Sequence, residues 1–337
     1  MRSVRIRARG LIDPSKGKWR SDVPSNSMRV VVTGGTGFLG SPLTRRLVQE
    51  GHDVVTYSRR EDPLLEGAAH VRGDVCGTER LRAVLAGADI VFHLAWTSLP
   101  QTSNENPLAD VQTNVDPGVA VLDACRAGRV GMVVFPSSGG TVYGSRAEEF
   151  LTETSETEPI CSYGITKLMF EKYLALYRHL YGLDYRVLRV SNAYGPGQPS
   201  DRPQGLIAVA MAKTLADEGL TVWGDGSAIR DYVYVDDVIE GFLAALKPLG
   251  ENASRTFNIA SREGHTILEV LAEIEQVSGR RPAISYEPPR DCDAQRVVLC
   301  NRRAEEELGW RPTVSLTEGV QQTWDSMRDF SLATEPS

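Results

Sequence analysis

The sequence has no run of about 18 apolar residues, the shortest stretch that is typical of a membrane-spanning helix. Cysteine and histidine are also scarce. The five cysteines form no CxxC pair, and with only five histidines they exclude a zinc site and a disulfide framework. The formal net charge is −7 without a long block of Lys and Arg in the body of the chain, which argues against a nucleic-acid partner. These absences predict a cytoplasmic protein with reduced thiols, no bound metal and no membrane partner.

Residues 1–27 differ in composition from the rest of the chain. They are rich in Arg and Lys and poor in apolar residues, and they contain no apolar stretch of the kind that a secretory signal carries. This composition predicts a disordered basic extension. The folded chain is expected to begin at about Met28, directly before the first apolar stretch.

From Met28 onward, short apolar stretches alternate with amphipathic ones. The expected strands lie at 30–32, 53–57, 90–92, 132–135 and 185–190, and the expected helices at 41–50, 81–85, 111–127 and 162–181. Such alternation predicts an α/β fold with a doubly wound parallel sheet and helices on both faces. The pattern of alternating apolar and amphipathic stretches ends at a Gly- and Pro-rich stretch after residue 195. We therefore expect a dinucleotide-binding domain over 28–195 and, over 196–330, mostly a smaller α/β substrate domain.

A glycine-rich turn joins the first expected strand to the first expected helix. It reads TGGTGFLG over residues 33–40, with Gly34, Gly37 and Gly40 spaced three apart. Glycines at these places let the backbone approach a pyrophosphate at the helix N-terminus, and the flanking strand and helix strengthen the signal. The spacing resembles the TGxxGxxG of the short-chain dehydrogenase/reductase superfamily, whose sheet is Rossmann-type. Motifs from Met28 to about Trp324 resemble its extended members, the NAD-dependent epimerase/dehydratase family, and most of all UDP-glucose 4-epimerases.

This resemblance implies NAD as the cofactor. At the end of the second strand, an acidic residue would bind the adenosine ribose of NAD, whereas an arginine would suit the 2′-phosphate of NADP. This chain has Ser58-Arg59-Arg60 there, so NADP stays open as an alternative. The residues that the resemblance places at the cofactor are Gly34, Gly37, Phe38, Leu39, Gly40, Ser58, Arg59, Asp74, Val75, Leu94, Ala95, Asn114, Tyr163 and Lys167.

Tyr163 and Lys167 form a YxxxK pair. Residues four apart share one face of a helix, so the hydroxyl and the ammonium can be neighbours. A free tyrosine has a pKa of about 10 and is a poor base at neutral pH. A nearby ammonium and an oxidised nicotinamide would both favour the phenolate. Tyr163 is therefore the expected general acid and base, with Lys167 as its electrostatic partner.

The segment Ser137-Ser138-Gly139-Gly140-Thr141-Val142-Tyr143-Gly144 resembles the SSSxTVYG of UDP-glucose 4-epimerases. Those enzymes use the third serine to hydrogen-bond the reacting hydroxyl of the sugar, and here Gly139 stands in its place. We expect Ser138, Thr141 or a water molecule to substitute. Family members that eliminate water or carbon dioxide carry carboxylates where this chain has Gly140 and Thr141. The segment therefore favours epimerisation over elimination.

Motifs in the second half resemble the nucleotide-sugar side of the same family. Asn192 is the asparagine of a segment that resembles the family's RxxNxYGPG. Trp223 and Arg230 lie in a segment that resembles its GDGxxxRDY, and Arg290 and Asp293 match an arginine and an aspartate later in the family's sequence. The resemblance implies that Asn192 contacts the diphosphate or sugar, that Trp223 lies near the uracil, and that both arginines bind phosphate. Asp293 would contact the ribose. Arg202, in the Gly/Pro-rich loop, could receive the carboxylate of a glucuronate.

Three functions follow, in decreasing order of support. The first is a nucleotide-sugar 4-epimerase that acts on a UDP-hexose, either UDP-glucose/UDP-galactose or UDP-glucuronate, through a transient 4-keto intermediate. The second is an NADPH-dependent 4-ketoreductase, which Ser58-Arg59-Arg60 motivates. The third is a non-catalytic nucleotide-binding protein, which Gly139 alone motivates. The expected helices over 111–127 and 162–181 are those that relatives pair into a dimer, so a homodimer is predicted.

Overall fold

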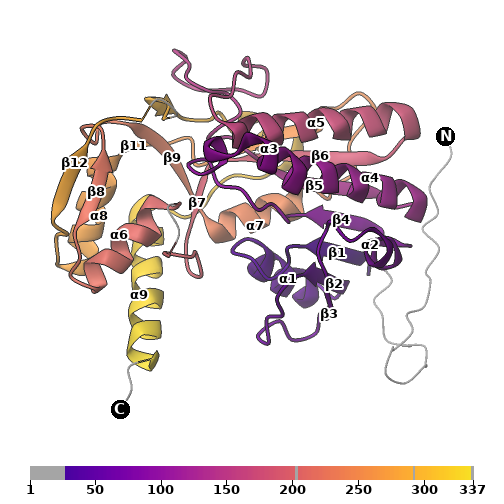
Figure 1. Cartoon of the computed structure of the whole chain (residues 1–337), viewed down its shortest axis with the longest axis horizontal. Coiled ribbons are helices and arrows are strands. Elements are labelled where there is room, and N and C mark those ends of the chain that lie inside the picture. The colour runs from indigo at the N-terminus through magenta and orange to yellow at the C-terminus, as the bar shows by residue number, and fades with distance from the viewer. Residues whose placement is uncertain (1–26, 202–203, 291–292, 335–337) are drawn as a thin grey trace.

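The computed structural model describes residues 27–201, 204–290 and 293–334 (Figure 1). The basic extension over residues 1–26 and Arg202 lie outside these ranges. A seven-stranded sheet runs in the order β10-β6-β5-β4-β1-β2-β3, and every neighbouring pair in it is parallel. The expected doubly wound parallel sheet is confirmed. Its strands are β1 (Arg29–Thr33), β2 (Asp53–Ser58), β3 (Ala69–Arg72), β4 (Ile90–His93), β5 (Met132–Ser138), β6 (Asp184–Val190) and β10 (Thr256–Ile259).

Helices cover both faces of this sheet because side chains alternate along each strand. Val30 and Val32 pack with Leu43 and Phe242, on the face that bears α1 (Gly40–Gln49) and α7 (Val235–Ala244). Val31 packs on the opposite face, which bears α2 (Thr78–Leu85), α4 (Asp116–Gly128) and α5 (Ser162–Tyr181). Short segments η1 (Ser103–Glu105), α3 (Pro107–Asp110) and η2 (Val111–Val115) lead into α4. Burial of apolar side chains against the sheet therefore holds these helices in place.

A second, smaller group of elements lies at the left of Figure 1. It contains a four-stranded sheet, a parallel strand pair and a separate apolar core in which Met211, Val270 and Val320 are fully buried. Its elements are β7 (Asn192–Tyr194), α6 (Leu206–Leu215), β8 (Leu220–Trp223), β9 (Ile229–Tyr234), β11 (Gly264–Thr266), α8 (Ile267–Ser278), β12 (Ile284–Glu287), β13 (Arg296–Val297) and α9 (Leu316–Thr334). The segment η3 (Ala304–Leu308) packs on the core of the large sheet.

The two groups do not divide the chain at one point. After residue 195 the chain returns to the large sheet, where α7 packs against α1 and β10 pairs with β6. Phe242 of α7 stacks on Phe92 of β4 with ring centroids 6.2 Å apart, which shows why this helix belongs to the first core. The segments α7 and β10 therefore belong to the core of the large sheet, although they follow residue 195.

Within the described ranges, no helix combines the length and apolarity that crossing a bilayer requires. In the same ranges, no three His, Cys, Asp or Glu side chains are grouped to hold a metal ion.

Candidate active site

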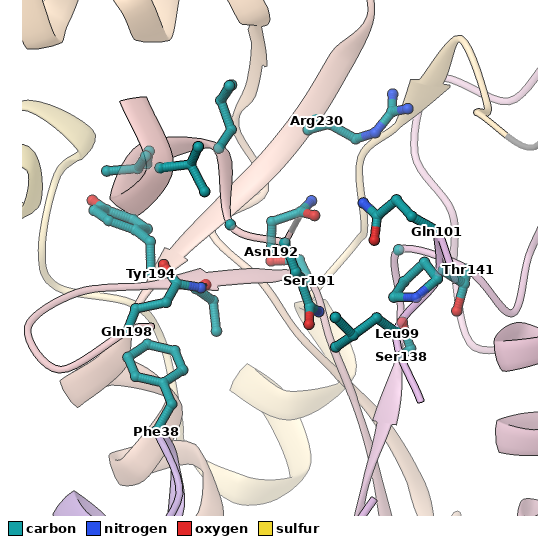
Figure 2. Close-up of a pocket in the computed structure, with 18 of the residues that line it drawn as sticks. Phe38, Leu99, Gln101, Ser138, Thr141, Ser191, Asn192, Tyr194, Gln198 and Arg230 are labelled. Carbon is teal, nitrogen blue, oxygen red and sulfur yellow. The ribbon is translucent and has the colours of Figure 1, made fainter. Parts of the chain in front are cut away.

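One large cleft runs between the two groups of elements (Figure 2). Its volume is about 1840 Å³, beyond the range of roughly 300–1,000 Å³ that a single small ligand usually needs. The lining begins at the glycine turn, passes the start of α5 and the end of β5, and ends at β8 and β9. The cleft therefore has room for two ligands end to end.

The glycine turn forms one end of this cleft. Gly34 has φ +72°, and a Cβ there would collide with the backbone of Leu94 and Ala95, which directly follow β4. Its N–H donates to the Tyr57 carbonyl at 2.9 Å, which fixes the turn between β1 and β2. Five predicted residues of the turn line the cleft: Gly34, Gly37, Phe38, Leu39 and Gly40. The N-terminus of α1 thus opens onto the cleft, an arrangement that suits a pyrophosphate.

Ser58, expected at the cofactor ribose, is engaged elsewhere. Its hydroxyl donates to the Arg60 carbonyl at 2.7 Å and accepts from Thr36 Oγ1 at 3.1 Å. Arg59 is exposed and does not line the cleft, whereas Arg60 does. The carboxylate of Asp62 also lines the cleft and accepts from the Ser41 hydroxyl at 3.0 Å. Sequence reasoning missed Asp62 because it lies in an irregular loop four residues beyond the motif position.

Four further residues predicted at the cofactor brace the cleft instead of lining it. Val75 is buried in the core, and the Asp74 carboxylate accepts from the Cys76 N–H at 3.0 Å. Ala95 packs below the glycine turn, while its neighbour Leu94 lines the cleft. Asn114 accepts from the Thr97 N–H at 2.7 Å and donates to Asp110 at 2.9 Å. The structure therefore does not bring these four side chains into the lining of the cleft.

Lys167 is almost fully buried beside Tyr163. Its ammonium donates to the Pro136 carbonyl at 2.9 Å, and it lies 4.2 Å from the ring centroid of Trp96 and 5.5 Å from that of Tyr163. Burial lowers the pKa of Lys167 to about 7, although the carboxylates of Glu171 and Asp110 oppose this shift. The Pro136 carbonyl orients the ammonium, and the nearby aromatic rings stabilise its positive charge.

Burial dominates the electrostatic environment of the Tyr163 hydroxyl. Burial raises its pKa above the usual value, and the nearby Cys161 and Asp110 raise it further. The Lys167 ammonium faces the Pro136 carbonyl. The surroundings of Tyr163 within the protein therefore favour the phenol, and an added positive charge in the cleft would favour the phenolate.

The first turn of α5 is fixed by side chains from a distant segment. Ser103 Oγ accepts from the Tyr163 N–H at 3.0 Å, and Asn104 Oδ1 accepts from the Ser162 N–H at 2.8 Å. The buried carboxylate of Asp110 accepts from the hydroxyls of Ser162 and Thr166 at 2.7 and 3.1 Å. These bonds satisfy helix N–H groups that have no partner within the helix. They also position Tyr163, and no local sequence pattern could have revealed them.

Gly139 does not face the cleft. A Cβ at this position would overlap the side chain of Leu299 and approach the carbonyls of Arg189 and Val190. Leu299 thus fills the space that a side chain at position 139 would need. The neighbouring Ser138 and Thr141 do line the cleft, and Thr141 Oγ1 is buried without a hydrogen-bond partner.

Ser137 also lines the cleft, but its hydroxyl is bonded to Glu171. Glu171 in turn holds Arg189 through two bonds of 3.1 and 2.7 Å. Arg189 donates to the Tyr143 hydroxyl at 3.0 Å, and that hydroxyl donates to Asn258 at 2.7 Å. This buried network lies directly beneath the end of β5 and keeps it rigid.

The residues predicted on the nucleotide-sugar side gather at the other end of the cleft. Asn192, Trp223, Arg230, Arg290 and Asp293 all line it, while Arg202 lies outside the described residues. Arg290 bonds Asp293 at 2.8 Å and lies 5.2 Å from the ring centroid of Trp223. In Figure 2, Arg230 lies across the cleft from Ser138. An aromatic ring and two arginines at one end form a suitable site for a base and a diphosphate.

Comparison with known proteins gives consistent relatives. The NAD dependent epimerase/dehydratase family matches residues 30–260. A UDP-glucose 4-epimerase of Mycolicibacterium smegmatis is 35% identical over 90% of this chain and all of its own. A dTDP-4-dehydro-6-deoxyglucose reductase of Escherichia coli is 31% identical over 89% of this chain and 97% of its own. The crystal structure of a UDP-glucose 4-epimerase from Thermotoga maritima with UDP-glucose superposes with TM-score 0.85 at 33% identity, covering 90% of this chain and 100% of that one.

Proposed function

Since the chain belongs to the NAD-dependent epimerase/dehydratase family, we propose that it is a UDP-hexose 4-epimerase. NAD is its cofactor, as the family description and the glycine turn indicate. The observation that carries the proposal is the place of Tyr163 and Lys167. They line the middle of one cleft, between the glycine turn and the end that holds Trp223, Arg230 and Arg290. In a nucleotide-sugar substrate, the sugar would lie between the cofactor and the nucleotide, and the acid and base must be next to it.

In this proposal, Tyr163 moves the proton of the sugar 4-hydroxyl. Bound NAD supplies removal and return of a hydride at the carbon that is inverted. Burial raises the pKa of Tyr163, and the positive charge of an oxidised cofactor would oppose this effect and favour the phenolate. Lys167 supports this charge from the aromatic pocket. Thr141, whose hydroxyl has no protein partner, is the best placed replacement for the serine that position 139 lacks.

The wall of the cleft beside Tyr163 supports epimerisation over elimination. Its residues there are Ser137, Ser138, Gly140 and Thr141, and none can act as the carboxylate acid or base that loss of water would need. Asn192, Arg230 and Arg290 would hold the diphosphate, Trp223 would contact the uracil, and Asp293 the ribose.

Proton NMR of UDP-glucose with the purified protein and no added cofactor tests this function. We expect UDP-galactose signals to grow to equilibrium, because the reaction regenerates its cofactor and tight binding retains it. The Tyr163→Phe variant, prepared identically, should leave the UDP-glucose spectrum unchanged. If the wild-type protein converts neither UDP-glucose nor UDP-glucuronate, the proposal is wrong.

A second function has specific support from the reductase of E. coli and from Ser58, which replaces the usual acidic residue. In that case the chain would be an NADPH-dependent nucleotide-sugar 4-ketoreductase. A reductase oxidises one NADPH for every keto sugar consumed, whereas an epimerase shows no net change in absorbance at the reduced nicotinamide band. NADPH added together with a nucleotide 4-keto sugar distinguishes the two, because only the reductase consumes both in equal amounts.

We also propose a homodimer formed through α5. Three of its exposed apolar side chains, Ile165, Leu176 and Leu180, are 49%, 43% and 53% accessible and fall on one face at helical spacing. Substituting both Leu176 and Leu180 with glutamate should halve the mass measured by light scattering, because paired carboxylates cannot be buried in an apolar interface. Phe330→Glu is the control, since it alters an exposed apolar side chain on α9. A monomeric wild-type protein would contradict the proposal.

A further inference from the structure

The middle of the cleft holds polar atoms that the protein leaves without partners. Within the described part of the chain, the buried side-chain atoms without a hydrogen bond include Trp96 Nε1, Gln101 Oε1, Thr141 Oγ1 and Gln198 Oε1. All four residues line the cleft. Buried polar atoms nearly always have a partner, so a group of them at one cavity indicates a polar ligand.

Gln101 is the member of this group that no sequence motif marked. In Figure 2 its amide projects into the cleft toward Asn192, from the same side as Thr141. Its carbonyl oxygen is buried without a hydrogen-bond partner from the protein, so it can accept a bond from a ligand hydroxyl. Gln198 differs, because its Nε2 already donates to the Ala193 carbonyl at 3.0 Å.

The loop that carries Gln101 is fastened to the helix that carries Tyr163. Two residues beyond Gln101, Ser103 accepts from the Tyr163 N–H, and its own hydroxyl donates to the Pro100 carbonyl at 3.2 Å. The Ser103 N–H donates to the Leu99 carbonyl at 3.0 Å, so the loop closes on itself around position 101. These bonds hold the backbone at Gln101 against the first turn of α5.

The surroundings of Gln101 are mostly uncharged. Near it, Figure 2 shows Leu99, Ser138, Thr141 and Asn192, with Arg230 as the cation. The Lys167 ammonium faces the Pro136 carbonyl and the Trp96 ring, and the proposed function assigns Arg230 to the diphosphate. A carboxylate placed here would have to compete with the diphosphate for Arg230, whereas a hydroxyl would find both donors and acceptors.

We propose that Gln101 hydrogen-bonds the sugar half of the substrate and makes the site selective for an uncharged hexose over a hexuronate. This inference rests on the proposed function and deepens it, since it names the substrate class. Gln101 acts in binding and orientation and moves no proton. Its contact is with the sugar, so it contributes nothing to binding of the nucleotide alone.

Calorimetric titration of the purified holoenzyme with UDP and with UDP-glucose tests the proposal. Gln101→Leu, which keeps the size of the side chain and removes its amide, should weaken UDP-glucose binding about 10-fold or more and leave UDP binding within about twofold. Gln276→Leu, at an exposed glutamine on α8, should change neither affinity. In the wild-type enzyme, kcat/KM for UDP-glucose should exceed that for UDP-glucuronate.

Two results would overturn the inference. Either Gln101→Leu binds UDP-glucose as tightly as the wild type, or the wild type prefers UDP-glucuronate. Equal weakening of UDP and UDP-glucose, with an unchanged melting temperature, would place Gln101 at the nucleotide and also refute it. If the wild-type protein binds UDP but Gln101→Leu has no effect, this inference alone fails. If it binds no UDP at all, the proposed function fails with it.

Discussion

Replacing Tyr163 with phenylalanine should lower kcat for epimerisation by about 10²- to 10⁴-fold, the usual contribution of a general acid and base. Phenylalanine keeps the ring beside Lys167 and removes only the hydroxyl. The backbone bond from position 163 to Ser103 is unaffected, so α5 should begin where it does in the wild type. The Kd for UDP-glucose, measured by calorimetry, should change by less than about threefold, because the lost effect belongs to the transition state.

Tyr173→Phe provides the matched control for this experiment. Tyr173 is on the same helix, ten residues further along, and packs partly buried against the core. Its hydroxyl has no place in the proposed reaction, so turnover should stay within about twofold of the wild type. If Tyr163→Phe retained more than a tenth of the wild-type rate, another group would have to move the proton.

Glu171→Ala should reduce the free energy of unfolding by about 3–5 kcal/mol, the usual cost of breaking a buried ion pair. The Arg189 guanidinium, 5% exposed, would lose both of its bonds to the carboxylate and remain buried with a positive charge. Ser137 would lose its acceptor at the same time. Urea denaturation followed by circular dichroism measures the change.

Three companion variants separate charge from packing. Glu171→Gln should cost less than Glu171→Ala, since an amide still accepts a bond from Arg189. The double variant Glu171→Leu/Arg189→Met should recover part of the lost stability, because it removes the charge along with its partner. Lys172→Ala, at an exposed neighbouring position, should change stability by no more than about 0.5 kcal/mol. An unchanged urea midpoint for Glu171→Ala would show that the pair contributes no net stability.

The sequence by itself determined the elements that depend on near neighbours. The period of the apolar residues predicted the strands and helices of the large sheet, and α5 begins and ends at the expected residues, Ser162 and Tyr181. The glycine turn predicted the cofactor end of the cleft, and the four-residue spacing of Tyr163 and Lys167 placed both on one helix face. Each of these signals is carried by residues a few positions apart, so a linear pattern can reveal it.

Only the tertiary structure decided which side chains reach the cleft. In the structure, α7 and β10 pack with the large sheet, although they come late in the chain. Leu299 occupies the space beside Gly139, and the Ser137 hydroxyl is hydrogen-bonded to Glu171. The fold also brings the loop of Gln101 against the start of α5, across about 60 residues of sequence. These contacts depend on packing between segments that are distant along the chain, and no periodicity records them. Local motifs thus predicted many of the residues that line the cleft, whereas the contacts among them depend on how the fold brings remote loops together.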